Sequence, residues 1–295
     1  MTPTVTAVIP CYNQGPFLAD CLQSLRAQTV QTWRAIVLND ASTDGQTPAI
    51  CDSFADDRVE VIHLPHNLGR ALVRNVGIER CNTEAILNLD ADDKLEPDYF
   101  ARTIPLLLGE RDIGVVYTDY RWFGVRDGAL YRLFGVRDGR LKSKPFDLKR
   151  LYREQYIGGG SLFRRSAWEK TRGYHADFTI GNEDYDFWLS LVEGGFRGAY
   201  LAEPLYCYRI HPQSWTATMA GGSDRIVRSR EALLHHHRAG FEQHGAAQDF
   251  EFATYLAEAR RLARVGDRCG AQAMWRRVLQ LDPWNFSARL GVLVA

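Results

Sequence analysis

The sequence is poor in the features that mark several classes of protein. It contains only 6 cysteines and 3 methionines among 295 residues. The cysteines form no Cys-x-x-Cys pair and no zinc-finger spacing, so neither a disulfide scaffold nor a structural zinc site is indicated. No apolar stretch approaches the roughly 18 residues that a membrane span needs. No basic residue precedes Arg26, which is unlike a secretory signal peptide. The predicted compartment is the cytoplasm, with the inner face of the membrane left open.

The sequence also lacks an excess of either charge. The 36 lysines and arginines balance 36 aspartates and glutamates, so the formal net charge is 0. This balance argues against nucleic acid as the main ligand. With 45% hydrophobic and 24% charged residues, the composition is that of a globular chain. The length indicates two domains, or one large α/β domain with an appendage.

The first ninety residues alternate between short apolar runs and segments with helical spacing. Runs rich in β-branched residues predict strands, and recurrence of apolar residues at helical spacing predicts helices between them. Such alternation indicates a parallel sheet with right-handed crossovers, and therefore an α/β, Rossmann-like, mostly parallel sheet flanked by helices. The expected strands cover residues 5–9, 35–38, 59–63 and 85–89, and the expected helices cover 17–25, 49–54 and 71–78.

Polar clusters directly follow three of these strands. Tyr12-Asn13 follows the first, Asn39-Asp40 the second, and the acidic run from Asp90 to Asp93 the fourth. Ligands of open parallel sheets bind at the carboxyl ends of the strands. We therefore expect these clusters to meet at one edge of the sheet, although they lie far apart in sequence.

Asp90 and Asp92 are separated by one residue. Alternate side chains of extended backbone point the same way, so both carboxylates can address one cation. Oxygen ligands suit Mg²⁺ or Mn²⁺, which commonly bridges a carboxylate and substrate phosphates. Solvated turn aspartates are the alternative, and the position at a strand end favours the cation site.

The remaining sequence has two further patterns. A near repeat at residues 121–128 and 132–139 carries two Asp-Gly turns and predicts a β-hairpin or meander, with an acceptor-facing flap as the alternative. From about residue 223 the composition becomes helical, with helices at 255–267 and 271–282 joined through Gly266. This pair resembles a tetratricopeptide hairpin at about 250–290, too short to form a solenoid alone.

Taken together, the motifs resemble the family 2 glycosyltransferases, which have the GT-A fold. The resemblance covers about residues 4–215, and the order and number of its short motifs make it specific. The matching segments are Val8 to Asn13, Val37 to Gly45, Asn67 to Gly77, Leu89 to Asp93, Gly158 to Arg165, Gly173-Tyr174, Gly181 to Leu189 and Tyr208 to His211.

The resemblance implies a role for individual residues. Asp40 would accept a hydrogen bond from a pyrimidine N3–H, Arg74 would lie beside the base or phosphates, and Asp90 would contact the ribose or sugar. Asp184 would be the catalytic base with Glu183 beside it. Asp92 would bind Mn²⁺ or Mg²⁺, and His211 would bind that metal or the diphosphate. Asn39 departs from the usual acidic pair, which puts the nucleotide preference in question. The expected nucleotide-sugar-binding residues are Pro10, Tyr12, Asn13, Asp40, Arg74, Asp90 and Ala91.

We therefore predict an inverting, metal-dependent glycosyltransferase. It would transfer a sugar from a UDP- or dTDP-sugar to a hydroxyl of a saccharide or lipid-linked acceptor in glycan or polysaccharide synthesis. Residues 1–220 would form the GT-A domain, with a nucleotide-binding half at 1–95 and an acceptor half at 96–220, and residues 221–295 a helical extension. The alternative is a degenerate, non-catalytic nucleotide-sugar-binding or assembly protein. Peripheral membrane contact and a homodimer stay open.

Overall fold

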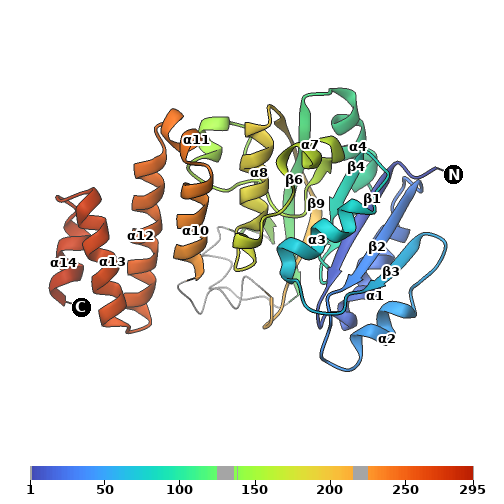
Figure 1. The fold of residues 1–295 in the computed structure, drawn as a ribbon, viewed down its shortest axis with the longest axis horizontal. Helices are drawn as coiled ribbons and strands as arrows, with labels where there is room; N and C mark the ends of the chain where they lie inside the picture. Colours follow the sequence, from blue (N-terminus) through green and yellow to red (C-terminus); the bar gives the residue numbers. More distant parts are fainter. Residues whose placement is uncertain (1, 125–135, 138, 215–224, 295) are drawn as a thin grey trace. The chain divides into compact units, whose positions relative to one another are not determined.

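The computed structural model describes residues 2–124, 136–137, 139–214 and 225–294 (Figure 1). The chain divides into two compact units. Unit 1 comprises Met1–Phe146, Tyr156–Thr179 and Glu183–Ala217, and unit 2 comprises Asp147–Gln155, Ile180–Asn182 and Thr218–Ala295. The domain limits expected at residues 95 and 220 stay predictions.

Unit 1 is built around a nine-stranded sheet with the order β3-β2-β1-β4-β8-β6-β9-β5, in which β7 pairs with β6. Its first four strands are parallel neighbours. They occupy the predicted segments, so the predicted α/β class is confirmed. Their bounds are β1 Val5–Cys11, β2 Trp33–Asn39, β3 Val59–His63 and β4 Ala85–Asn88.

The second half of the sheet is mixed. Strand β8 lies antiparallel between β4 and β6, whereas β6 and β9 pair in parallel along most of their length. Much of the predicted hairpin, residues 125–135 and 138, lies outside the described residues. In the described part, β7 pairs antiparallel with β6. The bounds are β5 Lys94–Leu95, β6 Ile113–Gly124, β7 Arg140–Leu141, β8 Leu162–Arg164 and β9 Arg197–Ile210.

Helices cover both faces of the parallel strands (Figure 1). Odd-numbered β1 residues such as Ala7 belong to the same core cluster as Leu18 and Leu22 of α1. Even-numbered Val8 faces α3 instead, because a Cβ at Gly77 would lie 2.4 Å from its Cγ1 atom. Alternation along β1 therefore places α1 and α3 on opposite faces. The unit 1 helices are α1 Gly15–Arg26, α2 Thr47–Asp52, α3 Gly69–Glu79, α4 Tyr99–Gly109, α7 Arg165–Thr171, the 3₁₀ turn η1 Ala176–Phe178 and α8 Glu183–Glu193.

Unit 2 is helical. Ala259 of α12 and Ala271 of α13 pack with Trp275 in one core cluster, and Gly266 makes the turn between these helices with φ +81°. The predicted helical hairpin is confirmed, although its first helix begins earlier than expected. Among the described residues, no helix is both long and apolar enough to cross a membrane. The helices are α6 Leu148–Leu151, α10 Arg225–His236, α11 Arg238–Gln243, α12 Ala247–Arg264, α13 Arg268–Leu281 and α14 Phe286–Val294.

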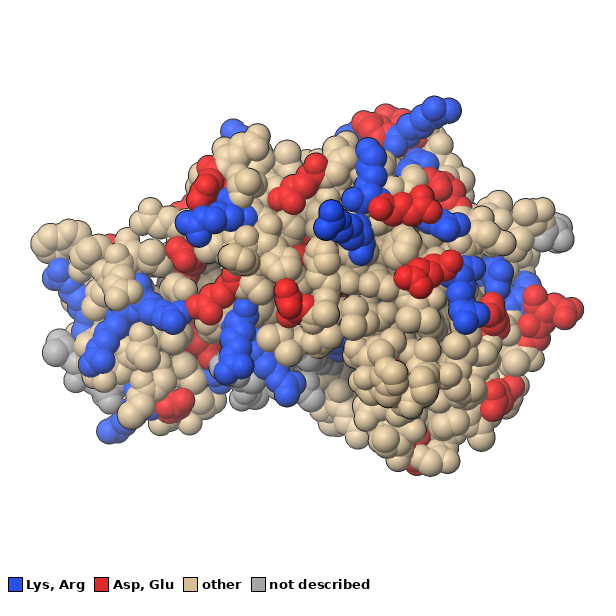
Figure 2. Space-filling model, in the orientation of Figure 1, with Lys and Arg blue, Asp and Glu red and all other residues tan. Residues whose placement is uncertain are grey.

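Charged side chains of both signs occur across the face shown in Figure 2. This mixture is expected for a chain in which 36 basic residues balance 36 acidic ones. We therefore expect the functional site to be defined by particular groups of residues rather than by a surface patch of one charge.

We predict that Gly77→Ala destabilises the protein. The new Cβ would lie 2.4 Å from Val8 Cγ1 and 2.8 Å from Leu38 Cδ1, so α3 would have to move away from the sheet. Overpacking of this kind costs about 1–3 kcal/mol, which denaturant unfolding would measure. Gly109→Ala is the matched control, since a Cβ there meets nothing within 4 Å. Equal unfolding midpoints for the two variants would contradict the packing described here.

Candidate active site

The polar clusters that follow β1, β2 and β4 meet at one edge of the sheet, as predicted. Register places Cys11 beside Asn39, and the Leu89 amide donates to the Val8 carbonyl at 2.9 Å. Pro10 lies near the end of β1, opposite Leu38 of β2. The carboxyl ends of these strands therefore present the Asn13, Asp40 and Asp90 segments side by side.

The loops after β1 and β2 are held together by Asn13. Its Oδ1 atom accepts hydrogen bonds from the amides of Thr43 and Asp44 at 2.8 and 3.2 Å. Asn13 and Ala41 both have φ 55°, a left-handed conformation that non-glycine residues rarely adopt. Beside them, 43% of Tyr12 is exposed. The paired loops thus leave one aromatic ring open at the edge of the sheet.

Asp40 is buried and caps helix α3. Its Oδ1 and Oδ2 atoms accept hydrogen bonds from the amides of Leu68 at 2.7 Å and Gly69 at 3.0 Å. This contact was not foreseen, because the resemblance assigned Asp40 to a nucleobase. Each carboxylate oxygen has a second lone pair, so a base could still be bound there. The nucleobase role stays a prediction.

The departure at Asn39 has a local explanation. Its Nδ2 donates to His63 Nδ1 at 2.8 Å, while His63 Nε2 lies 2.8 Å from Asp52 Oδ1. Asn39 Oδ1 accepts the Ser42 amide at 3.1 Å. An aspartate could not donate to His63, so the amide side chain matches its neighbours in this protein.

Arg74 is buried and bridges two carboxylates from distant parts of the chain. Its Nη1 atom lies 2.8 Å from Glu183 Oε1, and its Nη2 atom lies 2.8 Å from Asp90 Oδ1. Desolvation opposes ionisation of Asp90, but the charges of Arg74 and Arg70 outweigh it and lower the pKa of that carboxyl. The structure therefore places predicted residues Arg74, Asp90 and Glu183 together. Whether Arg74 also contacts a base or phosphates stays a prediction.

Asp184 lies at the start of α8, next to Glu183. Desolvation and the neighbouring Glu183 charge raise its pKa from 3.8 to about 7, against the opposing charge of Arg74. Its Oδ1 atom accepts the Tyr185 amide at 2.9 Å. A carboxyl that titrates near neutrality is suited to accept or donate a proton.

The glycine turn at residues 158–160 packs closely beneath Asp184. A Cβ at Gly158 would lie 1.9 Å from Tyr120 Oη, and one at Gly160 would lie 2.0 Å from Tyr206 Cε2. At Gly159 the nearest atom would be Asp184 Oδ2, at 3.3 Å. The first and last glycines of the turn therefore pack against tyrosine rings, and the middle glycine, Gly159, lies against the Asp184 carboxylate.

The acidic turn after β4 gathers three carboxylates. Oxygen atoms of Asp90, Asp92 and Asp93 lie within 4.8 Å of one another, and Ala91 between them is buried. His211, far along the chain, places Nε2 3.0 Å from Asp92 Oδ2. Asp92 and His211 are thus brought together as predicted, and their oxygen and imidazole donors suit a divalent cation.

Other residues of the site were missed by the sequence analysis. Asp93 is buried and accepts hydrogen bonds from Tyr206 Oη at 2.7 Å and the Arg209 amide at 2.8 Å. Burial and the charges of Asp92 and Asp90 raise the pKa of Asp93 well above its usual range. In sequence, Asp93 differed from its acidic neighbours only in position, and Tyr206 carried no signal.

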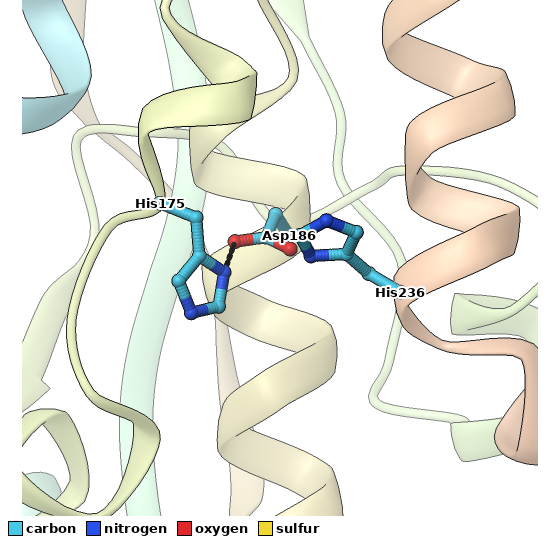
Figure 3. A group of neighbouring side chains, drawn as sticks. All are labelled: His175, Asp186 and His236. Carbon is cyan, nitrogen blue, oxygen red and sulfur yellow. Dashed lines mark hydrogen bonds and ion pairs between the residues drawn. The ribbon is translucent and has the colours of Figure 1, made fainter.

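A second histidine–carboxylate pair involves helix α8, which also carries Asp184. His175 Nδ1 lies 2.9 Å from Oδ2 of Asp186, a residue with no exposed surface (Figure 3). This bond attaches the segment before η1 to α8, two residues beyond Asp184. Asp186 lies within the motif recognised at Gly181 to Leu189, but its partner could not be inferred, because the contact depends on how the segment before η1 folds back.

The fold is similar to that of several solved structures, among them a mannosyltransferase. The mannosyltransferase PcManGT from Pyrobaculum calidifontis, solved with GDP-Man and Mn²⁺, has a TM-score of 0.63 at 18% identity and covers 99% of this chain and 84% of that chain. TarS from S. aureus has a TM-score of 0.58 at 16% identity, covering 99% and 92%. At such identities the likeness concerns the fold alone. The predicted GT-A glycosyltransferase fold is confirmed.

The family follows from sequence. Residues 6–172 match the family described as glycosyl transferase family 2, and this chain belongs to it. EpsH of Bacillus subtilis (strain 168) is 32% identical over 72% of this chain, and EpsE of the same organism is 31% identical over 70%. The chain spans 62% of the length of EpsH and 73% of that of EpsE. The prediction of a family 2 glycosyltransferase is confirmed.

We predict that the contribution of Asp184 to stability falls as pH rises. Between pH 3.8 and about 7 this carboxyl holds a proton in the folded chain but not in the unfolded chain. Through this group the folded state binds more protons in that window, and its contribution to the free energy of unfolding falls by at most about 1.4 kcal/mol per pH unit. In denaturant unfolding in EDTA, the slope of the free energy of unfolding against pH should be less negative, or more positive, for Asp184→Asn than for wild type. Asp57→Asn, an exposed control, should retain the wild-type slope, and an identical slope in all three proteins would refute the assignment.

Proposed function

We propose that the protein is an inverting, divalent-cation-dependent glycosyltransferase. The observation that carries this proposal is that Arg74 joins Glu183, the neighbour of Asp184, to Asp90, which shares one acidic turn with Asp92 and its partner His211. Family membership supports transfer of a glycosyl group, and the arrangement of the acidic residues supports the roles given to them here.

The donor would lie along the loops after β1 and β2. Tyr12 offers an exposed ring for a base, and Asp40 retains acceptor capacity beside it. Pro10, Asn13 and Ala91 shape the backbone around this position. The likeness to TarS, solved with UDP-GlcNAc, supports a UDP- or dTDP-sugar, whereas PcManGT was solved with GDP-Man. The fold is therefore compatible with more than one base.

Asp92 and His211 would hold Mn²⁺ or Mg²⁺. Their facing atoms are 3.0 Å apart, and carboxylate and imidazole are both ligands of such ions. When bound, the cation would neutralise charge that develops on the diphosphate leaving group, an effect worth several kcal/mol. Asp90 is already paired with Arg74, which suits it to contact the sugar side of the donor.

Asp184 would take the proton from the acceptor hydroxyl. An inverting reaction needs one such base, on the face of the sugar opposite the leaving group. With a pKa of about 7, Asp184 is partly deprotonated near neutrality yet basic enough to accept a proton. Glu183, fixed by Arg74 at 2.8 Å, would hold the negative charge that keeps this pKa high.

The acceptor is proposed more broadly, as a hydroxyl of a saccharide or of a lipid-linked saccharide. Among the relatives, TuaG of Bacillus subtilis (strain 168) is named for teichuronic acid biosynthesis and is 32% identical over 40% of this chain. This likeness supports a role in polysaccharide synthesis. Peripheral membrane contact and a homodimer stay predictions.

We predict different losses for two variants in a transfer assay with UDP-, dTDP- or GDP-sugars and Mn²⁺. Asp184→Asn should lower turnover at least about 10²-fold, because the base is lost, while Mn²⁺-dependent binding of the nucleotide persists. Asp92→Ala should bind the nucleotide no more tightly with Mn²⁺ than without it, and its turnover should not rise when Mn²⁺ is added. Asp57→Asn, on the exposed surface, should behave as wild type.

Unchanged turnover in both site variants would overturn the assignments. The non-catalytic alternative has its own observation, the use of the Asn39 amide within its loop. Calorimetry that shows tight nucleotide binding without cation dependence, in a protein that transfers no sugar, would establish that alternative instead.

A further inference from the structure

Strand β9 makes several hydrogen bonds to the acidic turn after β4, and one of them goes to the main chain of the turn rather than to a side chain. Tyr206 Oη and the Arg209 amide both donate to the side chain of Asp93. The Arg209 guanidinium instead donates from Nε to the main-chain carbonyl of Asp92, at 2.7 Å. One residue of β9 therefore holds two consecutive residues of the turn, one of them through its backbone.

The Arg209 side chain is itself held on several sides. Its Cζ atom lies 5.1 Å from the ring centroid of Phe17 and 4.4 Å from that of Phe123. Nη2 lies 2.7 Å from Asp20 Oδ2, and only 14% of the arginine side chain is exposed. A planar guanidinium between two rings loses little freedom when it donates a hydrogen bond, so its Nε–H direction is well defined.

The backbone contact has a property that the side-chain contact of Asp92 lacks. Asp92 Oδ2 and His211 Nε2 face each other at 3.0 Å. If both become ligands of a cation, their lone pairs turn to it, and their mutual hydrogen bond is given up. The bond from Arg209 to the Asp92 carbonyl uses no ligand atom and can persist in both states. It is therefore able to keep the Asp92 peptide oriented when the side-chain bond is absent.

We propose that Arg209 is a positioning residue for the divalent cation: its guanidinium fixes the Asp92 peptide, and so directs the Asp92 carboxylate, before the cation binds. This inference rests on the proposed function, in which Asp92 and His211 hold the cation. Groups that orient metal ligands from outside the coordination shell typically contribute 10–100-fold to metal affinity or activity. Arg209 acts through Asp92 and needs no contact with substrate.

The test is Mn²⁺ binding to the full-length chain, measured by electron paramagnetic resonance with UDP, dTDP or GDP, whichever raises the melting temperature. Arg209→Gln should weaken Mn²⁺ binding about 10–100-fold. Arg209→Lys keeps the charge but loses the planar donor, and should stay weaker than wild type by at least about fivefold. Arg121→Gln is the matched control, because Arg121 lies on β6 opposite Cys207 and contacts Glu96 rather than the acidic turn.

A second readout separates positioning from a purely structural role. At saturating Mn²⁺, turnover of Arg209→Gln should return to within about threefold of wild type, while the Mn²⁺ concentration for half-maximal turnover rises with the binding constant. A structural role would lower the melting temperature without changing the Mn²⁺ affinity of the folded chain.

The outcomes distinguish this inference from the function on which it rests. Wild-type Mn²⁺ affinity in Arg209→Gln would overturn the positioning role and leave the proposed function intact. If Arg209→Gln does not fold, a folded Arg209→Lys with wild-type affinity would overturn the role equally. A wild-type protein that binds no Mn²⁺ with any of the three nucleotides would overturn the proposed function, and the positioning role with it.

Discussion

A single buried guanidinium connects the two halves of unit 1. Arg74, on α3, lies 2.8 Å from Asp90 after β4 and 2.8 Å from Glu183 at the start of α8. Glu183 is only 4% exposed, and of its two arginine partners Arg74 is the nearer, at 2.8 Å against 3.6 Å for Arg70, so loss of Arg74 would leave a buried charge with only the longer contact. The same cation opposes the rise in the pKa of Asp184, which burial and Glu183 produce. The placement of the acidic pair and its proton affinity therefore both depend on Arg74.

The parallel half of the fold could be predicted from sequence, and the reason is local. Strands such as β1 and β2 are short apolar runs that end at polar residues, and helices with regular spacing lie between them. These signals need no knowledge of distant residues. The preference for right-handed crossovers agrees with the parallel arrangement of these strands, but it does not fix their order in the sheet.

The other half depends on contacts between distant residues. β8 has only three residues, too few for a recognisable pattern, yet it joins β4 to β6. β6 and β9 pair in parallel across more than seventy intervening residues, and their register shifts twice along the pair. No periodicity within either segment indicates its partner. The sequence analysis accordingly expected a local hairpin where the described residues of β6 also pair with β9.

The site residues fall into the same two groups: some could be predicted from local sequence and topology, and others depend on contacts between distant residues. Strand-end residues such as Asp40 and Asp90 could be placed at one edge, because topology alone brings them together. Asp184, Glu183 and His211 came from resemblance rather than from pattern. The contacts of Tyr206 and Arg209 with the acidic turn could not be predicted, because they depend on the register of β9 and on side-chain directions. Arg209 lay within a recognised motif, yet nothing in its spacing assigned it a partner.

The capping of α3 by Asp40 ties the end of β2 to the helix that carries Arg74. Asp40 holds the first amides of the helix, and Arg70 and Arg74 lie on the first two turns that follow. Because Arg74 pairs with both Asp90 and Glu183, a displacement of the first turns of α3 would reach both carboxylates through one side chain. The end of β2 and the acidic pair at the start of α8 are therefore connected through one short helix.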